Sequence, residues 1–375
     1  MKYYLVAGEA SGDLHASNLM RGIKEFDSEA NLRYYGGDLM QAEGGVLVKH
    51  YRSMAFMGFL EVIQNIRTIS KNLKQCKEDI LQFNPDAVIL VDYPGFNLRI
   101  ARFAKENGFK VFYYIAPKVW AWNESRVKLL KRYIDKLFVI FPFEIDYFKK
   151  HGIDAIYQGN PLMDAIEQKA GERSSFSDFC QNNNLDGKPI IALLAGSRKQ
   201  EIRYNLPTML SIISRFPDYQ FVIAGAPSLD ADVYMPYIGR SNVNLIFDQT
   251  QTLLKHSTLA IVTSGTATLE AALLNVPEVV CYRGNTISML IAWIVIKVKY
   301  ISLVNLIMGK EVVRELKQFD YNASNLIEHV KRILPGGEER NEMLKNFQTL
   351  KDMLGDVGCS KRIAQIIVEN TITNT

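Results

Sequence analysis

Short apolar runs alternate along this chain with longer amphipathic stretches, and this alternation limits the fold more than any other feature. The apolar runs are rich in β-branched and aromatic residues and predict buried strands at Lys2–Val6, Ala87–Val91, Lys110–Ile115, Leu137–Ile140, Ile190–Leu194, Gln220–Ile223, Leu259–Val262 and Glu278–Tyr282. The amphipathic stretches predict helices at Asp13–Phe26, Phe59–Phe83, Asn97–Asn107, Ser125–Tyr133, Gln200–Ser214 and Thr266–Leu274. Strands that alternate with helices form parallel sheets with right-handed crossovers.

The alternation weakens in one polar stretch, from Gly171 to Lys188, and then begins again. We therefore predict an α/β protein with two Rossmann-like, doubly wound domains that face one cleft, residues 1–170 and 171–340. The length of 375 residues agrees with this division, because a domain has roughly 150 residues. A helical segment at Asn341–Glu369 belongs to neither alternation, and we expect residues 341–375 to pack back on the first domain.

Charge and cysteine content exclude several classes of protein. There are 44 basic and 40 acidic residues, a net charge of +4, and no concentrated basic region of the kind that binds nucleic acid. The four cysteines are far apart, which predicts buried free thiols rather than disulfides or a zinc site. No secretory signal is visible, and the most apolar stretch, Met289–Val298, is too short to span a bilayer.

Acidic residues follow two of the predicted strands in the first half. Glu9 lies in the turn Gly8–Asp13, where its place before the helix fits a cap poorly and an acceptor for sugar hydroxyls better. Asp92 comes directly after five apolar residues, at the carboxyl edge of a buried strand. Burial raises the pKa of a carboxyl group and makes it a stronger base. Asp92 is equally well explained at this point as a helix cap or a turn residue.

Two further segments of the first half allow two interpretations each. The tryptophans of Pro117–Trp122 suit core packing or a platform for sugars and acyl chains. The apolar run Met54–Leu60 precedes a helix that carries Arg67, Lys71, Lys74 and Lys77. It suits an ordinary core or an interfacial membrane element.

Two anion-binding turns are predicted in the second half. The first is Gly196-Ser197-Arg198, followed by Glu201, and the second is Ser264-Gly265-Thr266 at the start of a helix. Amides at a helix N-terminus bind anions, and the arginine fork matches phosphate oxygens. Two such turns in one α/β unit suit a diphosphate.

Three polar side chains complete the predicted nucleotide site. Glu270 lies one helical turn after Thr266 and points toward a ribose or into solvent. Asn305, within an apolar run, needs polar partners, which are either backbone groups or a ligand. Gln318 follows in the same segment.

No metal site or cofactor is predicted. The five histidines are scattered without ligand spacing. The one Asp-x-Asp pattern, Asp230-Ala-Asp232, lies in a polar stretch and is interpreted as the start of a surface helix.

Taken in order, these segments resemble the lipid-A-disaccharide synthase family. The matching segments cover most of the chain and are Gly8–Asp13, Gly36–Gly45, Met57–Val62, Val91–Asn97, Tyr114–Trp122, Gly159–Asp164, Ala195–Ile202, Ser264–Leu273 and Tyr300–Gln318. The resemblance implies the metal-independent two-domain fold known as GT-B. Epimerases that act on UDP-N-acetylglucosamine share that fold, but the apolar, basic-flanked segments argue against a purely soluble substrate.

The resemblance also implies a reaction and a location. An inverting transfer would join UDP-2,3-diacylglucosamine to 2,3-diacylglucosamine 1-phosphate, giving a β(1→6) tetraacyl disaccharide 1-phosphate and UDP. Asp92 matches the base of the family, with Glu9 and Arg198 as further catalytic candidates. The nucleotide would be held by Gly196, Ser197, Arg198, Glu201, Ser264, Gly265, Thr266, Glu270, Asn305 and Gln318. The family is cytoplasmic and contacts the inner membrane of Gram-negative bacteria peripherally; a second copy of the chain is a candidate partner.

Overall fold

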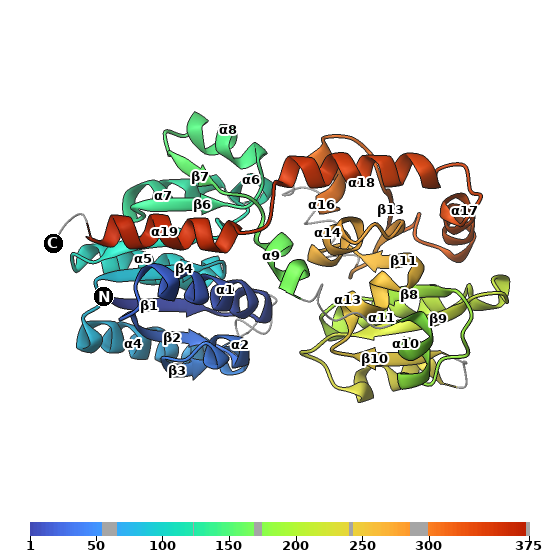
Figure 1. Cartoon of the computed structure of the whole chain (residues 1–375), viewed down its shortest axis with the longest axis horizontal. Coiled ribbons are helices and arrows are strands. Elements are labelled where there is room, and N and C mark those ends of the chain that lie inside the picture. Colours follow the sequence, from blue (N-terminus) through green and yellow to red (C-terminus); the bar gives the residue numbers. More distant parts are fainter. Residues whose placement is uncertain (55–65, 123, 169–174, 240–242, 286–298, 373–375) are drawn as a thin grey trace. The chain divides into compact units, whose positions relative to one another are not determined.

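The computed structural model describes residues 1–54, 66–122, 124–168, 175–239, 243–285 and 299–372. The chain divides into two compact units. The first unit contains Met1–Glu167 together with Leu354–Thr375, and the second contains Gln168–Met353. Figure 1 shows a sheet with covering helices in each unit.

The sheet of the first unit has seven described strands in the order β3-β2-β1-β4-β5-β6-β7, and every neighbouring pair is parallel. The strands are β1 (Lys2–Ala7), β2 (Asn31–Gly36), β3 (Val46–His50), β4 (Ala87–Val91), β5 (Lys110–Tyr114), β6 (Lys136–Val139) and β7 (Ala155–Tyr157). The helices are α1 (Ala10–Phe26), α2 (Asp38–Ala42), α4 (Ile66–Phe83), α5 (Pro94–Glu106), α6 (Val119–Trp122), α7 (Val127–Tyr133), α8 (Phe143–Lys150), α9 (Pro161–Gln168) and α19 (Cys359–Ile372), with short 3₁₀ turns at Tyr51–Ser53 and Glu124–Arg126.

This sheet is buried on both faces, as parallel sheets usually are. Along β1, Tyr4 and Val6 point into one core, while Tyr3, Leu5 and Ala7 point into the other. The first core is closed by α4, α5 and α7, and the second by α1 and α19. Continuous apolar strands are therefore expected, and β4 is fully buried along its length.

Helix α19 returns to the first unit after the second unit has ended. It contributes Ile363, Ala364, Ile367 and Val368 to the core beside α1. Its first turn is held by the carboxylate of Asp164, which accepts hydrogen bonds from the amides of Gly358, Cys359 and Ser360. A carboxylate at a helix N-terminus also complements the helix dipole.

The sheet of the second unit has six described strands, all parallel, in the order β10-β9-β8-β11-β12-β13. They are β8 (Ile190–Leu194), β9 (Gln220–Gly225), β10 (Asn244–Phe247), β11 (Ser257–Thr263), β12 (Glu278–Tyr282) and β13 (Arg314–Lys317). The helices are α10 (Phe176–Asn182), α11 (Lys199–Leu210), α12 (Met235–Ile238), α13 (Thr250–Lys255), α14 (Thr266–Leu273), α16 (Leu303–Met308), α17 (Ala323–Ile333) and α18 (Arg340–Leu354), with 3₁₀ turns at Ile213–Arg215 and Ala231–Val233.

The predicted fold class, two parallel-sheet α/β domains, is confirmed. The final segment, predicted to be helical over Asn341–Glu369 and to pack on the first domain, is divided between the two units. The structure has two helices, because the chain turns between them at Gly355 and Gly358, both with positive φ. Only α19 packs in the first unit, whereas α18 belongs to the second, where Met343 Sδ accepts a hydrogen bond from the amide of Glu278.

Candidate active site

Both sheets reverse their strand order at one place, and the predicted site residues follow the strands at these places. In the first sheet the reversal lies between β1 and β4, which lead to Glu9 and Asp92. In the second sheet it lies between β8 and β11, which lead to the two predicted anion-binding turns. Ligands of doubly wound sheets bind outside the carboxyl ends of the strands at such a switch point.

Asp92 begins a strained turn that its surroundings hold in place. Asp92 and Tyr93 both have positive φ, 45° and 49°. Residues other than glycine rarely adopt such values. The carbonyl oxygen of Asp92 accepts hydrogen bonds from Asn97 Nδ2 at 2.8 Å and from the Tyr113 hydroxyl at 2.7 Å. The amide of Asp92 donates to the carbonyl of Tyr114 at 3.0 Å. Strain of this kind persists only where the surroundings over-determine it, and it gathers at functional sites.

The carboxyl group of Asp92 has the electrostatic character of a base. Burial at the end of β4 raises its pKa above the ordinary value, while the positive charge of Lys118 and a hydrogen bond from the Tyr93 amide oppose the rise. The residue as a whole is only partly buried. The carboxylate of Asp92 is therefore more basic than a solvated one.

Glu9 and Asp92 are brought to the same edge of the first sheet with Tyr93 beside them. Glu9 occupies the N-cap position of α1 with an extended backbone and makes no capping hydrogen bond with its side chain. Burial, helped by the charge of Glu9, raises the pKa of the Tyr93 hydroxyl to about 12. The Tyr93 hydroxyl donates a hydrogen bond to the carbonyl of Met54.

Two neighbours of Glu9 have structural roles. Asp13 caps α2 rather than α1, since its carboxylate accepts from the amides of Gly37, Leu39 and Met40. Burial lowers the pKa of His15 to about 4, so His15 is neutral at neutral pH.

The tryptophan segment is bonded to a buried carboxylate on α8 that sequence reasoning missed. Glu144, in the first turn of α8, accepts a hydrogen bond from Trp120 Nε1 at 2.9 Å and from the amides of Ile140 and Phe141 at 3.0 Å. Burial raises the pKa of Glu144 to about 7, although these three donors and Lys118 favour its charged form. An acidic residue in the first turn of an amphipathic helix resembles a solvated one in the sequence, and no signal distinguishes it.

In the second unit, Glu201 organises the turn after β8. Its carboxylate accepts hydrogen bonds from the Ser197 amide at 2.8 Å and from Arg198 at 2.7 Å. The Ser197 amide, expected to be free for an anion, therefore has an internal acceptor. Gly196 has φ 119°, and a β-carbon there would press against the side chain of Glu201. Ser197 and Arg198 are themselves exposed.

The second turn follows β11 and opens α14. The Ser264 hydroxyl donates to the carbonyl of Ile301 at 2.8 Å, which ties this turn to the segment before α16. Gly265 and Thr266 are exposed, and the first amides of a helix have no intrahelical acceptor. Glu270, on the next turn of α14, accepts a hydrogen bond from Gln251 at 2.8 Å. The order of strands places this turn beside Gly196–Arg198.

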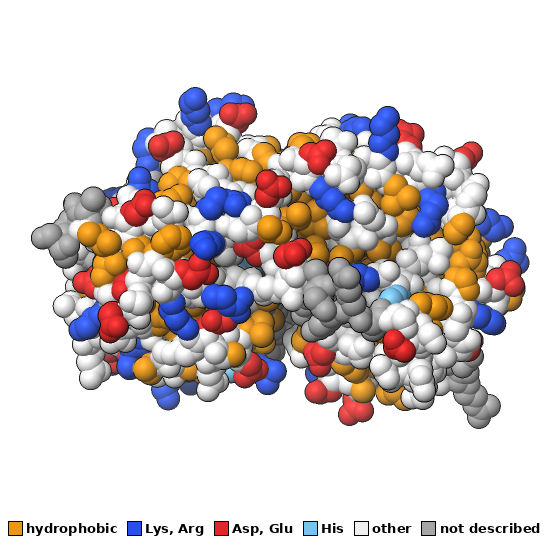
Figure 2. All heavy atoms as spheres, viewed as in Figure 1, with side chains coloured by type: hydrophobic (Ala, Val, Ile, Leu, Met, Phe, Trp, Pro, Cys, Tyr) orange, Lys and Arg blue, Asp and Glu red, His pale blue; other side chains and the backbone are white. Residues whose placement is uncertain are grey.

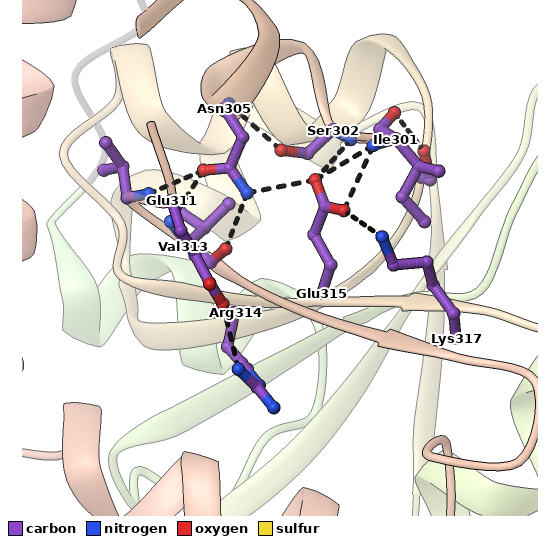
Figure 3. A network of polar contacts seen from close by, with 10 residues as sticks. Ile301, Ser302, Asn305, Glu311, Val313, Arg314, Glu315 and Lys317 are labelled. Atoms are coloured by element: carbon purple, nitrogen blue, oxygen red, sulfur yellow. Dashed lines mark hydrogen bonds and ion pairs between the residues drawn. The ribbon is translucent and has the colours of Figure 1, made fainter. Parts of the chain in front are cut away.

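Asn305 lies at the centre of a buried network (Figure 3). Its oxygen accepts hydrogen bonds from the amides of Val312 and Val313, and its nitrogen donates to the carbonyl of Val313 and to Glu315. Glu315 also accepts from the amides of Ile301 and Ser302. All four hydrogen-bonding positions of the Asn305 amide are thus used within the protein. The sequence left backbone groups or a ligand open as partners of Asn305; in the structure its partners are three backbone groups and the carboxylate of Glu315.

Gln318 has a similar place after β13. Its side chain accepts a hydrogen bond from the Gly284 amide at 2.9 Å and donates to the Gly284 carbonyl at 3.4 Å. Arg283, which sequence reasoning missed, donates to the carbonyls of Gln318 and Tyr321. Asn305 and Gln318 therefore shape the loops around the second switch point.

Several other expectations concern charge, metal and membrane. On the face seen in Figure 2, basic and acidic side chains are interspersed over both units. Within the described ranges, no three His, Cys, Asp or Glu side chains are grouped as metal ligands. No helix among those same residues is long and apolar enough to cross a bilayer. The apolar segments Met54–Leu60 and Met289–Val298 lie outside the described residues, apart from Met54.

Comparison with known proteins identifies the family. A family model described as lipid-A-disaccharide synthetase matches residues 3–367. The chain belongs to this family. The lipid-A-disaccharide synthase of Geobacter sulfurreducens is 34% identical over 372 residues, which are 97% of this chain and 96% of that protein. That of Myxococcus xanthus is 35% identical over 372 residues, with the same coverage of both chains.

Solved structures agree in fold. The UDP-GlcNAc 2-epimerase of Neisseria meningitidis superposes with a TM-score of 0.69, covering 99% of this chain and 100% of that one, at 15% sequence identity. A glycosyltransferase of Rickettsia africae gives a TM-score of 0.58 at 12% identity, with 100% and 99% coverage. Identities this low establish the fold alone. Membership of the lipid-A-disaccharide synthetase family makes the chain a hexosyltransferase that forms the lipid A disaccharide.

Proposed function

We propose that the chain transfers the diacylglucosaminyl group of UDP-2,3-diacylglucosamine to 2,3-diacylglucosamine 1-phosphate. The product is the β(1→6) tetraacyl disaccharide 1-phosphate, and UDP is released. The observation that carries this proposal is the family match over residues 3–367. It is supported by a strained Asp92 at the switch point of the first sheet.

Asp92 is the proposed general base. The 6-hydroxyl oxygen of the acceptor forms a bond to the anomeric carbon, and its proton passes to the Asp92 carboxylate. The bond between that carbon and the UDP oxygen breaks, and the electron pair leaves with UDP. The raised pKa of Asp92 improves this proton transfer. Glu9, on the same sheet edge, is proposed to accept a hydrogen bond from a sugar hydroxyl.

The second unit is proposed to hold UDP. Arg198 and the first amides of α14 stabilise the charge that develops on the departing diphosphate, as preorganised donors do in other transferases. Glu201 orients Arg198 through the hydrogen bond at 2.7 Å. Glu270 is proposed to contact the ribose, with Asn305 and Gln318 fixing the loops around it. No metal is needed in this scheme, and we expect turnover to persist in a chelator.

Peripheral attachment to a membrane is a further part of the proposal. Helix α4 exposes Arg67, Lys71 and Lys74 on its surface, and Ile66 at its start is 60% exposed. A basic face next to apolar residues suits the surface of an anionic bilayer. Both substrates carry acyl chains, so the enzyme must meet them at such a surface. We place the chain on the cytoplasmic side, where UDP-sugars are made.

The decisive experiment measures UDP release by the purified protein in detergent. UDP-2,3-diacylglucosamine is supplied with and without the acylated sugar 1-phosphate, and the lipid product is analysed by mass spectrometry. We expect UDP and a disaccharide only when both substrates are present, with or without chelator. The proposal would be rejected if UDP were released at the same rate without the acceptor, or if the donor were converted to its epimer. Loss of turnover that added magnesium restores would reject its metal-free part.

A further inference from the structure

Glu144 is fully buried and accepts three hydrogen bonds from the protein, and among the described residues its carboxylate forms no ion pair. One oxygen accepts from Trp120 Nε1, and the other accepts from the amides of Ile140 and Phe141. The side chain has no exposed surface. A buried carboxylate costs several kcal/mol unless its hydrogen bonds are satisfied, and these three donors offset that cost.

Trp120 is the side chain that Glu144 holds. The indole ring also meets Phe143 edge-on, with ring centroids 5.0 Å apart, and Phe143 stacks on Phe141 at 5.6 Å. These contacts fix one edge and the nitrogen of the indole, while the residue itself is only half-buried. A fixed and partly open aromatic ring can serve as a platform for the apolar face of a sugar.

Lys118 acts electrostatically on both Glu144 and Asp92. It lies on the loop after β5, between the strands that lead to Asp92 and to Glu144. Its charge acts on both carboxyl groups, and its ammonium lies 6.0 Å from the centre of the Phe141 ring. In the described residues Lys118 has no ion-pair partner, and its side chain is exposed. Because β4 and β5 are neighbouring parallel strands, Trp120, which follows β5, and Asp92, which follows β4, lie at the same edge of the first sheet.

We propose that Glu144 is a positioning residue for the acceptor: it holds Trp120 as the aromatic platform on which the acceptor sugar ring rests near Asp92. This inference rests on the proposed function. The acceptor binds while Glu144 is ionised and accepts all three donors. Protonation removes one acceptor position and loosens the indole, so binding weakens as the pH falls through the pKa of about 7. The other groups that face Glu144 are the Lys118 ammonium and, from β7, the Tyr157 hydroxyl.

The test compares Glu144→Gln, Trp120→Phe and the control Asp146→Asn. Gln keeps the shape of Glu144, but its NH₂ group replaces one of the two oxygens that accept hydrogen bonds from N–H donors. Phe keeps an aromatic ring at 120 and removes the donor. Asp146 is an exposed acid on the same helix. We expect the acceptor KM to rise about tenfold in each of the first two variants, as loss of one charge-assisted hydrogen bond predicts. The donor KM and kcat should stay within about threefold, and Asp146→Asn should match the parent protein.

A spectroscopic measurement separates positioning from mere folding. Tryptophan fluorescence of the parent protein, titrated without substrates, should change with a midpoint near pH 7, and both variants should lack this transition. An unchanged acceptor KM in a folded Glu144→Gln protein would overturn the inference, as would a transition that persists in Trp120→Phe. If Glu144→Gln fails to fold, Trp120→Phe alone decides. If the parent protein releases no UDP with both substrates, the proposed function fails, whereas an active parent with unchanged KM values defeats only this inference.

Discussion

The ring of Tyr93 occupies the position where a β-carbon on Gly8 would stand. The backbone of Gly8, at the end of β1, therefore packs against the ring of Tyr93, in the turn after β4. This contact lies beside Asp92 and contributes to the strained conformation in which Asp92 and Tyr93 both have positive φ.

Gly8→Ala should test how tightly that turn is held. The added methyl group must displace Tyr93, which we expect to cost about 1–3 kcal/mol of unfolding free energy and to lower kcat by moving Asp92. Urea unfolding and steady-state kinetics measure the two effects. Gly95→Ala is the control, because nothing lies within 4 Å of a β-carbon at that position. Equal stability of the two variants would contradict the packing argument.

Asp92→Asn should separate catalysis from stability. We expect kcat to fall about 10²- to 10⁴-fold, the usual range for loss of a general base. The raised folded pKa means that the folded state binds a proton more tightly than the unfolded chain. Parent stability therefore decreases as pH rises from the unfolded pKa through the folded one, and Asn, always neutral, should melt at a higher temperature at neutral pH.

The same pKa also governs the pH profile of the parent enzyme. Because the base must be ionised, kcat/KM should fall on acidification at a pH above the ordinary aspartate value. Near-normal turnover in Asp92→Asn, measured as UDP release, would remove Asp92 as the base.

Arg198→Ala should weaken UDP binding more than it affects the fold. Loss of a charged hydrogen bond to a phosphate predicts a Kd for UDP about 10- to 100-fold higher by isothermal titration calorimetry. Arg203→Ala serves as the matched control, because Arg203 is an exposed arginine on helix α11, which Arg198 precedes at the N-cap position. A Kd that changes equally in both variants would argue against a diphosphate site at Arg198.

Asn305→Asp should destabilise the second unit. Asp cannot donate to the Val313 carbonyl and places a second carboxyl group beside Glu315, and each unsatisfied buried group costs about 1–3 kcal/mol. Asn322→Asp is the control, since Asn322 caps α17 with its oxygen and Asp caps equally well. Chemical unfolding decides, and equal stability of the two variants would mean that the network in Figure 3 contributes little.

Glu278→Gln should stabilise the protein at neutral pH. Glu278 is fully buried at the start of β12, neither of its oxygens has a hydrogen-bond partner among the described residues, and burial raises its pKa well above the ordinary value. The stability of the parent protein therefore falls as the pH rises above about 4.5, the unfolded value. The advantage of Gln should grow over that range and vanish below it. Thermal melts between pH 4 and 8 measure this, with Glu311→Gln, at an exposed position, as the control. If the prediction is wrong, the difference in melting temperature between Glu278→Gln and the parent protein will stay constant over this pH range.

The sequence predicted most of the central strands and missed the edge strands of both sheets, together with the central strand β2. Runs such as Ala87–Val91 are apolar throughout because both faces of the sheet are covered. The strand β13, Arg314–Lys317, has only one apolar residue, since an edge strand is half solvated. The edge strands β3, β7 and β10 and the central strand β2 were also missed; β7 has only three residues, and β2 carries Arg33 between its apolar residues.

Prediction of the site residues depended on how clearly each one is marked by its neighbours in the sequence. Asp92 was singled out by its place directly after five apolar residues and by its match to the base of the family, whereas Glu144 follows its strand at a distance and resembles a surface acid. The partners of Asn305 lie seven to ten residues further along the chain, and only tertiary structure shows that they use its whole hydrogen-bonding capacity. The roles of Asp92, Glu9 and the nucleotide-binding residues stay predictions.

The return of α19 to the first unit also orders events during synthesis. All of Gln168–Met353 precedes α19 in the chain, so a ribosome completes the second unit while the first still lacks one wall of its core. Until then the faces of α1 and β1 that α19 covers are open to solvent. Domains generally fold as units during translation, and here the second unit can reach its final packing earlier than the unit whose synthesis began first.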